Sequence, residues 1–527
     1  MSETTRTYDV IVIGAGPVGE NVAERTRAAG LTTVIVEREL LGGECSFWAC
    51  DPSKALLRPV IARADARRIP GLAHAAAAPL DVEAVLAHRD RMSSYWKDDD
   101  QVDWLNSVSV DLVRGHGRLE GPRTVRVQTS DDESVLLTAR HAVAVSTGTS
   151  AALPDIPGLE TVRPWTSREA TSSERVPARL VVVGGGVVGV EMATAWQALG
   201  SQVTLLVRED EVLPRMEPFA GELVADGLRE TGIDLRFGTS VSRLTRKDGD
   251  VHITLADGDR LAADEILFAI GRTPRTGDLG LETIGLTPGD WLRVDNTFRV
   301  TDVPDGWLYA VGDVNHRALM THQGKYQARI AGAVISARIA GEPIDDARWG
   351  AHVATADNTA VPQVVFTHPE VASVGLTTRE AQRYGHRIKV VDYDLAHVAG
   401  AHQYIEGYRG QARLLIDTER GTVAGATFAG PGVAELLHSA TIAITGEVPI
   451  DRLWHAVPAF PTLSEVWLRL LETHRSRLSL QIRPAHPIGL APATSSAPSP
   501  WTSGSPTLAT CQRPGMPFDP SLRHACL

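Results

Sequence analysis

Two of the four cysteines in the chain, Cys45 and Cys50, lie five positions apart in the stretch "LLGGECSFWACDPSKALLRP". A pair this close can consist of small buried residues, of ligands for a metal ion, or of thiols that form and break a disulfide. Stable disulfides are rare in cytoplasmic proteins, so in such a protein the pair is more typical of catalysis or metal binding. The two residues by themselves leave these alternatives open.

A glycine motif precedes the cysteines. Gly14, Gly16 and Gly19 have the spacing GxGxxG and stand between an apolar strand and a helix, in "YDVIVIGAGPVGENVAERTRAAGLTTVIVER". Backbone N–H groups and the helix dipole at such a turn can hold a pyrophosphate. Glu37 ends the next expected strand, where an acidic side chain hydrogen-bonds a ribose. This pattern predicts a dinucleotide site.

The same pattern returns about 170 residues later, in "ARLVVVGGGVVGVEMATAWQALGSQVTLLVRED". Its glycines are Gly184, Gly186 and Gly189. The position that corresponds to Glu37 holds Val207, and Arg208 follows. A cation there suits a 2′-phosphate and favours NADPH, although two acidic residues after it keep NADH open. Two dinucleotide folds imply two dinucleotides, most simply a bound FAD and an exchangeable nicotinamide in a hydride relay.

The elements that must position these groups alternate between strand and helix. The two motifs predict two Rossmann-like domains and an α/β fold. Between them, "VRVQTSDDESVLLTARHAVAVSTG" alternates like a small antiparallel sheet. A third region has strands followed by helices, which predicts an α+β domain. From about residue 480 the chain is rich in Pro, Ser, Ala and Thr without periodicity, so we expect a disordered tail there.

The whole chain has 527 residues and a net charge of −12, which argues against a general nucleic-acid-binding protein. No apolar run approaches the roughly 18 residues that a membrane-spanning helix needs. The first residues, "MSETTRTYDVIVIGAG", are expected to form a buried strand rather than a signal peptide. We therefore expect a cytoplasmic protein.

With these motifs the sequence resembles the class I pyridine nucleotide-disulfide oxidoreductases, the group of dihydrolipoamide dehydrogenase, glutathione reductase and mercuric reductase. The resemblance also rests on "GGECSFWACDPSKAL", "VSTGT", "GRTP", "LYAVGDV", "VVFTHPEVASVGLT" and "PTLSE". It implies FAD and NADPH or NADH as cofactors, and a homodimer whose active sites each borrow the partner's "PTLSE" segment. The implied divisions are residues 1–157 and 278–349 for an FAD-binding domain, 158–277 for an NAD(P)-binding domain, 350–475 for a dimerisation domain and 476–527 for the tail.

The resemblance also implies the roles of particular residues. Cys45 and Cys50 are expected to form a redox-active disulfide, with Cys50 against the flavin and Cys45 exchanging with substrate. Positions five apart lie about 140° around a helix, so such a bond has to bend the turn. Lys54 and Glu191 are expected to pair beside the flavin. The remaining implied site residues are Gly148, Gly271 and Asp313 at the cofactors and Glu465 in catalysis; no metal site is expected.

Two departures concern the chemistry. Members of the group carry an acid–base histidine in the closing segment, where this chain reads "WHAVPAFPTLSE" and places Phe460; His455 lies five residues upstream. Asp51 follows Cys50, and a carboxylate there raises a thiol pKa. Thiol exchange needs proton transfer, whereas hydride transfer to a flavin does not. We therefore expect the acceptor to be a disulfide or a non-thiol compound such as a quinone.

Three alternatives remain. The first two are dihydrolipoamide dehydrogenase and mercuric reductase proper, and the third is a non-catalytic, flavin-bound sensing protein. In mercuric reductases and large thioredoxin reductases, C-terminal cysteines reach the partner's active site, but there the two are adjacent or nearly so. Cys511 and Cys526 are 15 residues apart, so we expect a poorly constrained extension, and the role of the two cysteines stays open.

Overall fold

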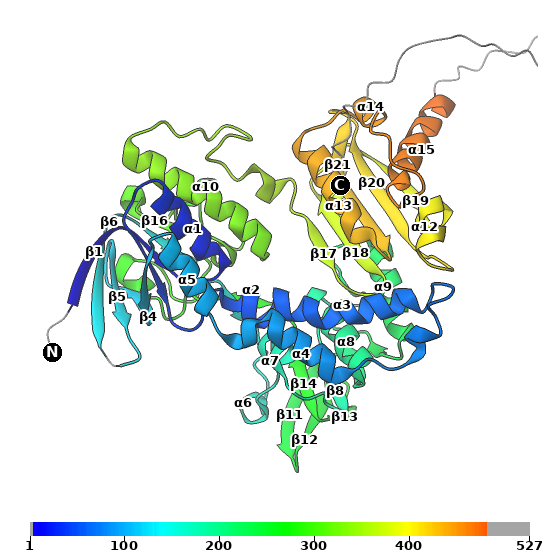
Figure 1. The fold of residues 1–527 in the computed structure, drawn as a ribbon, viewed down its shortest axis with the longest axis horizontal. Helices are drawn as coiled ribbons and strands as arrows, with labels where there is room; N and C mark the ends of the chain where they lie inside the picture. The colour runs from blue at the N-terminus through cyan, green and yellow to red at the C-terminus, as the bar shows by residue number, and fades with distance from the viewer. Residues whose placement is uncertain (1–3, 132, 482–527) are drawn as a thin grey trace, which may run out of the picture. The chain divides into compact units, whose positions relative to one another are not determined.

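The computed structural model of the chain describes residues 4–131 and 133–481. Its first sheet, at the left of Figure 1, has the strand order β3-β2-β1-β6-β5-β4, with β16 beside β6. The parallel strands are β1 (Thr4–Ile13), β2 (Thr33–Glu37), β3 (Asp111–Arg114), β6 (Ser134–Val145) and β16 (Leu308–Ala310). The antiparallel strands are β4 (His116–Leu119) and β5 (Thr124–Gln128).

The antiparallel pairing predicted within residues 125–148 is present between β5 and β6, but it does not form a sheet of its own. β6 is 12 residues long, and it pairs in parallel with β1 over most of that length. The antiparallel strands therefore extend the parallel sheet.

Helices α1 (Pro17–Ala28) and α10 (Thr321–Ala340) cover one face of this sheet and lie side by side (Figure 1). Val22 of α1 and Val334 of α10 share a buried core with Val10 and Val12 of β1. A segment from Leu279 to Trp307 covers the opposite face. Burial on both faces explains the continuous apolar runs of the strands.

The second sheet has the order β10-β9-β8-β14 and is parallel throughout. Its elements are β8 (Arg179–Val183), α8 (Val187–Leu199), β9 (Gln202–Leu206), α9 (Pro218–Glu230), β10 (Asp234–Arg236) and β14 (Glu265–Phe268). An antiparallel ribbon packs on it, consisting of β11 (Val241–Lys247), β12 (Asp250–Leu255) and β13 (Arg260–Ala263). A short ladder, β7 (Thr149–Ala151) with β15 (Arg272–Pro274), stands apart from both sheets.

Six further α-helices lie among the described residues of the first 200. They are α2 (Gly43–Trp48), α3 (Cys50–Ala66), α4 (Val82–Met92), α5 (Asp99–Ser107), α6 (Leu159–Val162) and α7 (Ser167–Ser172). α3 contacts α8, so the helix that carries Cys50 reaches the second dinucleotide-binding unit.

The third sheet is antiparallel, with the order β17-β18-β21-β20-β19. Its strands are β17 (Gln363–Val365), β18 (Glu370–Gly375), β19 (Ile388–Asp394), β20 (Gln411–Asp417) and β21 (Thr422–Gly430). Its helices are α11 (Thr378–Arg383), α12 (Ala399–Tyr404), α13 (Leu437–Thr445), α14 (Ile450–Leu453) and α15 (Glu465–Gln481). The predicted fold class, two Rossmann-like domains and an α+β C-terminal domain, is confirmed.

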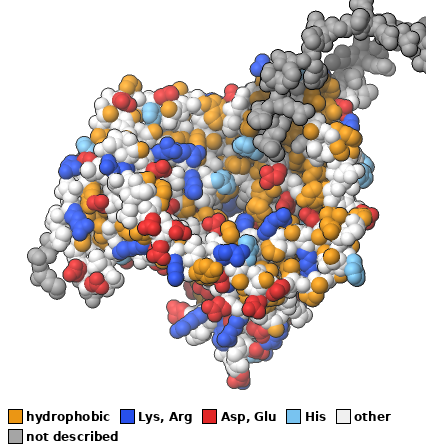
Figure 2. All heavy atoms as spheres, in the orientation of Figure 1, with side chains coloured by type: hydrophobic (Ala, Val, Ile, Leu, Met, Phe, Trp, Pro, Cys, Tyr) orange, Lys and Arg blue, Asp and Glu red, His pale blue; other side chains and the backbone are white. Residues whose placement is uncertain are grey.

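The predicted tail begins inside α15, which continues to Gln481. The rest of it, with Cys511 and Cys526, lies outside the described residues. Among residues 4–131 and 133–481, no helix has both the length and the apolar character that crossing a bilayer requires. Acidic and basic side chains are intermixed over the face shown in Figure 2.

Candidate active site

The first glycine turn joins β1 to α1, and its three glycines have different reasons to be glycine. Gly14 has a φ of +97°, and a Cβ there would lie 2.5 Å from the Ser146 carbonyl oxygen. A Cβ on Gly19 would lie 1.8 Å from the Gly14 carbonyl oxygen, so helix and turn touch at this point. A Cβ on Gly16 would meet nothing within 4 Å. The protein itself requires Gly14 and Gly19, whereas Gly16 leaves room for a ligand.

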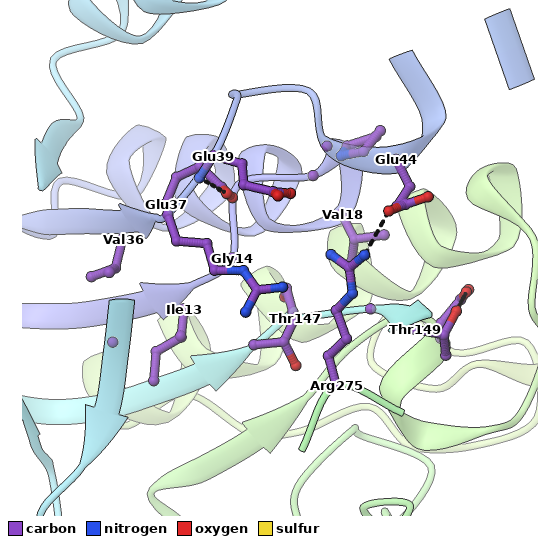
Figure 3. A pocket seen from close by; sticks show the side chains of 18 of the residues that line it. Ile13, Gly14, Val18, Val36, Glu37, Glu39, Glu44, Thr147, Thr149 and Arg275 are labelled. Atoms are coloured by element: carbon purple, nitrogen blue, oxygen red, sulfur yellow. Dashed lines mark hydrogen bonds and ion pairs between the residues drawn. The ribbon is translucent and has the colours of Figure 1, made fainter. Parts of the chain in front are cut away.

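Glu37, at the end of β2, is held by the backbone on both carboxylate oxygens. Oε2 accepts a hydrogen bond from the Ala15 N–H at 2.8 Å, and Oε1 accepts one from the Glu39 N–H at 2.8 Å. These bonds fix the carboxylate beside the glycine turn, at the wall of the cavity drawn in Figure 3. Each oxygen has a further lone pair with which to accept from a ribose hydroxyl.

The cavity is open to solvent and has a volume of about 160 Å³. Six of the predicted site residues line it: Gly14, Gly16, Glu37, Cys45, Gly148 and Asp313. Arg275 and Glu44 also line it, and they point toward each other with their side chains 2.5 Å apart (Figure 3). The buried hydroxyls of Ser146 and Thr147 have no hydrogen-bond partner. Unpaired donors of this kind, with the bare Gly16 turn, fit a group that carries phosphates and hydroxyls, as FAD does.

Asp313 forms part of the same wall. Thr149 donates its hydroxyl proton to Asp313 Oδ2 at 2.7 Å, and Arg272 lies 3.9 Å away. Burial raises the pKa of the Asp313 carboxyl. The two other predicted glycines hold the β7–β15 ladder beside it: the Gly148 carbonyl accepts from Arg275 N–H, and the Gly271 carbonyl accepts from Ala152 N–H. Only Gly148 of these two is among the residues that line the cavity.

The cysteines lie on two helices rather than on one bent helix. α2 ends at Trp48, Ala49 breaks the helix with φ −143° and ψ −93°, and Cys50 begins α3. The bend expected at the pair is thus a complete interruption. Both thiols are free, and Cys50 Sγ is 3.4 Å from the Thr321 hydroxyl oxygen. Thr321 and Cys45 line the cavity.

The two thiols differ in acidity. The hydrogen bond from Cys45 lowers the pKa of the Cys50 thiol to about 6, and Thr321 and Lys54 act in the same direction. Burial and, more weakly, Asp51 act in the opposite direction, the latter as predicted, but both are outweighed. The hydrogen bond to Cys50 and burial raise the pKa of Cys45. Cys50 is therefore the more acidic thiol of the two, the order expected if Cys50 faces the flavin.

Lys54 and Glu191 are brought together by α3 and α8. Lys54 Nζ lies 2.8 Å from Glu191 Oε2, and only 3% of Glu191 is exposed. Glu191 Oε1 accepts a hydrogen bond from the Phe366 N–H at 2.9 Å. The predicted ion pair is thus present. The Phe366 N–H, which the sequence did not predict at this place, is a third group bound to it.

The second glycine turn repeats the first. A Cβ on Gly189 would lie 1.8 Å from the Gly184 carbonyl oxygen, and one on Gly186 would meet nothing within 4 Å. Val207 is fully buried, whereas the Arg208 side chain is 82% exposed and contacts Glu209 at 2.7 Å. Arg208 is therefore accessible to an exchangeable ligand.

The C-terminal residues singled out in the sequence, unlike the Lys54–Glu191 pair, are not seen with the partners predicted for them. Glu465 opens α15, is 5% exposed and pairs with Arg469 at 2.5 Å rather than with either cysteine. Phe460 is 75% exposed, and His455 is also exposed. A contact of this segment with a partner's cysteines stays a prediction. The described residues contain no group of three or more His, Cys, Asp and Glu side chains that could hold a metal ion.

Two contacts at the site were missed from the sequence. Thr321 is 271 residues from Cys50, and nothing in its surroundings marks it. Phe366 lies inside the quoted motif "VVFTHPEVASVGLT", which was a usable signal, but its bond to Glu191 spans 175 residues.

Comparison with known proteins gives the family. The pattern described as pyridine nucleotide-disulphide oxidoreductase matches residues 8–328, and the dimerisation domain of that family matches residues 361–470. Dihydrolipoyl dehydrogenase 3 of Pseudomonas aeruginosa is 32% identical over 468 residues, which cover 87% of this chain and 96% of that protein. The dihydrolipoyl dehydrogenase of Haloferax volcanii is 31% identical over 491 residues, covering 88% and 95%.

Solved structures share the fold. The HOCl-induced flavoprotein disulfide reductase RclA from Escherichia coli aligns with a TM-score of 0.75 at 23% identity, covering 88% of this chain and 99% of that one. LpdA from Mycobacterium tuberculosis aligns with a TM-score of 0.74 at 24% identity, covering 89% and 99%.

The chain belongs to the pyridine nucleotide-disulphide oxidoreductase family. It is an FAD-dependent oxidoreductase that uses NAD(P)H, as its two glycine turns predicted. The match to the dimerisation domain supports the predicted homodimer.

Proposed function

We propose that the enzyme takes hydride from NAD(P)H at the second glycine turn and delivers two electrons through FAD, either by way of the Cys45–Cys50 pair to a disulfide or directly from the flavin to a non-thiol acceptor such as a quinone. The observation that carries the proposal is the thiol pair beside the cavity: Cys45 and Thr321 line it, Cys50 Sγ lies 3.4 Å from the Thr321 hydroxyl oxygen, and the pKa of Cys50 is lowered. FAD, when bound, would accept a hydride from NAD(P)H and pass two electrons on to the acceptor.

Different residues of the chain bind the two nucleotides, stabilise the reduced flavin and exchange with a disulfide. Gly14, Gly16, Gly19, Glu37 and Asp313 hold the flavin nucleotide, while Gly184, Gly186, Gly189 and Arg208 receive the nicotinamide. Lys54, anchored by Glu191, supplies positive charge where the flavin becomes negative on reduction. Cys45 then attacks a substrate disulfide, and Cys50 regains the bond to Cys45 as the substrate leaves as a dithiol.

Proton transfer decides between acceptors. A departing sulfur needs a proton, and general acid–base catalysis contributes roughly 10²–10⁴-fold. Phe460 cannot carry a proton, and the Cys45 thiol has a raised pKa. Disulfide exchange is therefore slow, and a quinone that takes electrons from the flavin avoids this step.

A second candidate is dihydrolipoyl dehydrogenase proper. It is favoured by the two relatives cited above, which carry that name and are matched over 95% or more of their length. In that case His455 takes over proton transfer. The non-catalytic sensing protein has only Phe460 in its favour, and the intact thiol pair and Lys54–Glu191 ion pair speak against it.

The test is a panel of acceptors, namely lipoamide, glutathione disulfide, several quinones and mercuric ion, assayed with NADPH and with NADH. We expect quinone turnover to exceed lipoamide turnover clearly. Phe460→His should raise lipoamide turnover by up to about 10²-fold and leave quinone turnover nearly unchanged. Phe460→Leu is the matched control, because it changes the same exposed side chain without adding an acid–base group.

Efficient lipoamide reduction by the unaltered enzyme would contradict the missing-base argument. Loss of that activity in His455→Ala would then establish the dehydrogenase. Failure of every acceptor together with failure of NAD(P)H to reduce the flavin would favour the sensing protein.

The proposal also places the enzyme in the cytoplasm. It further includes a homodimer in which each active site receives Glu465 from the other subunit. A monomer in sedimentation that keeps full turnover would contradict the shared site.

A further inference from the structure

Phe366 links the third sheet to the Lys54–Glu191 ion pair. It follows β17 directly, within the region that matches the dimerisation domain. Its N–H donates to Glu191 Oε1 at 2.9 Å, and Lys54 Nζ lies 5.1 Å from the centre of its ring. One residue therefore contacts both members of the pair, one through its backbone and the other through its side chain.

The backbone contact fixes the carboxylate. Glu191 is 3% exposed, and each of its oxygens has one partner: Phe366 N–H on Oε1 and Lys54 on Oε2. A buried carboxylate is stable only when both oxygens are satisfied. Because the Phe366 N–H belongs to the backbone, it sets the direction in which Oε2 points toward Lys54.

The side-chain contact limits the movement of Lys54. This side chain is 38% exposed, and a lysine has four rotatable bonds, so one ion pair leaves the ammonium considerable freedom. The face of an aromatic ring attracts a cation within about 6 Å of its centre. The ring of Phe366 thus supplies a second fixed contact for the ammonium group.

Phe366 can serve as such a reference because its segment is anchored to the helix that carries Lys54. His368 Nε2 lies 3.2 Å from Asp65 Oδ1, near the end of α3. Phe366 packs against the core that contains Leu56 and Leu57 of α3 and Val190 of α8. Ring, lysine and glutamate therefore belong to one packed unit.

We propose that Phe366 is a positioning residue that holds the Lys54 ammonium in place and thereby favours the reduced, negatively charged flavin. The inference rests on the proposed function, because it takes Lys54 to lie beside the flavin. It means that the dimerisation region influences the flavin within its own subunit, in addition to any contact across the dimer.

The test is the midpoint potential of FAD in the purified holoenzyme. Phe366→Leu removes the aromatic face and keeps the N–H. We expect it to lower the equilibrium ratio of reduced to oxidised flavin about threefold, which is about 14 mV for a two-electron couple. Phe366→Trp keeps an aromatic face, so its potential should equal that of the unaltered enzyme. Should the leucine variant not fold, Phe366→Met preserves more of the volume and carries the same expectation.

Phe237→Leu is the matched control. Phe237 is also half-buried against the same core, and the Arg229 guanidinium lies 5.7 Å from its ring centre. This substitution should leave the flavin potential unchanged. An equal shift in Phe237→Leu would overturn the inference, because the effect would then come from general loosening of the core.

Lys54→Met separates the inference from the proposed function. We expect this variant to lower the potential more than Phe366→Leu does, and the double variant to equal Lys54→Met alone. If Lys54→Met leaves the potential unchanged, the placement of Lys54 at the flavin is wrong and the inference falls with it. If Lys54→Met shifts the potential but Phe366→Leu does not, or adds fully to it, only the role of Phe366 is overturned.

Discussion

The two glycine turns have the same backbone and different surroundings. In each, the first glycine has a positive φ, +97° at Gly14 and +120° at Gly184, and a Cβ on the third would lie 1.8 Å from the carbonyl oxygen of the first. In each, the middle glycine faces open space. The two turns thus share the backbone form and the open space that suit a pyrophosphate.

The difference lies at the end of the following strand. After β2, the Glu37 carboxylate bonds back to the Ala15 N–H and stands at the wall of a cavity with unpaired buried hydroxyls. After β9, Val207 is buried and Arg208 is turned to solvent. On the proposed assignment, the turn is suited to a dinucleotide in both places, and the end of the next strand distinguishes the FAD site from the nicotinamide site.

The largest expected effect comes from alanine at the middle glycines. Gly16→Ala should fold normally, since its Cβ meets no protein atom within 4 Å. It should weaken FAD binding at least about hundredfold, because the methyl group occupies the space of the pyrophosphate. Gly186→Ala should keep its FAD and raise the KM for NAD(P)H. Flavin content and steady-state kinetics of both variants measure this, and FAD loss in Gly186→Ala instead would reverse the assignment of the two sites.

The two helices that follow the turns differ at the corresponding positions Glu20 and Val190. Burial raises the pKa of Glu20 to about 7, and the nearby Glu37 adds to the shift. A carboxyl whose pKa is higher in the folded state stabilises the protein below its unfolded pKa, and that stability is lost as pH rises from 4.5 through 7.

Glu20→Gln should therefore be more stable than the unaltered enzyme at pH 8, by up to about 3 kcal/mol, and equally stable at pH 4. Thermal unfolding at the two pH values measures the difference. A gain in stability at pH 4 as large as that at pH 8 would show that the amide acts through packing instead of charge.

The smallest expected effect concerns Arg208. Arg208→Glu should change the preference for NADPH over NADH by about tenfold, mainly through the KM for NADPH, since about 1.4 kcal/mol of charge-assisted binding is lost. Arg229→Glu is the matched control, because it is another exposed arginine paired with a neighbouring acid. An unchanged ratio would place the 2′-phosphate elsewhere or identify NADH as the donor.

Features that depend on a local pattern, or on a motif shared with the family, could be predicted from the sequence. The glycine turns, Glu37 and the fold class follow from local spacing and periodicity, and the Lys54–Glu191 pair follows from the family resemblance. The approach of Thr321 to Cys50 could not be predicted, because packing of α10 brings it about and no local pattern marks it. The interruption at Ala49 was expected only as a bend. The spacing of the two cysteines indicates that the helix is distorted between them, but it does not reveal that the helix ends and a second one begins.

The boundaries drawn between the dinucleotide-binding and dimerisation domains stay predictions. The contact of Phe366 with Glu191 shows why such lines are hard to draw from sequence, since residues on both sides of them build one site.

Anaerobic titration of the purified enzyme with NADPH or NADH tests the central claim most directly, namely that one turn retains FAD and the other delivers hydride to it. We predict that the yellow colour bleaches and that a long-wavelength band from the Cys50 thiolate beside the flavin appears at pH 8, because the pKa of Cys50 is lowered. The band should be absent in Cys50→Ser and retained in Cys45→Ser. A flavin that neither nucleotide reduces, or a band that persists without Cys50, would contradict the account.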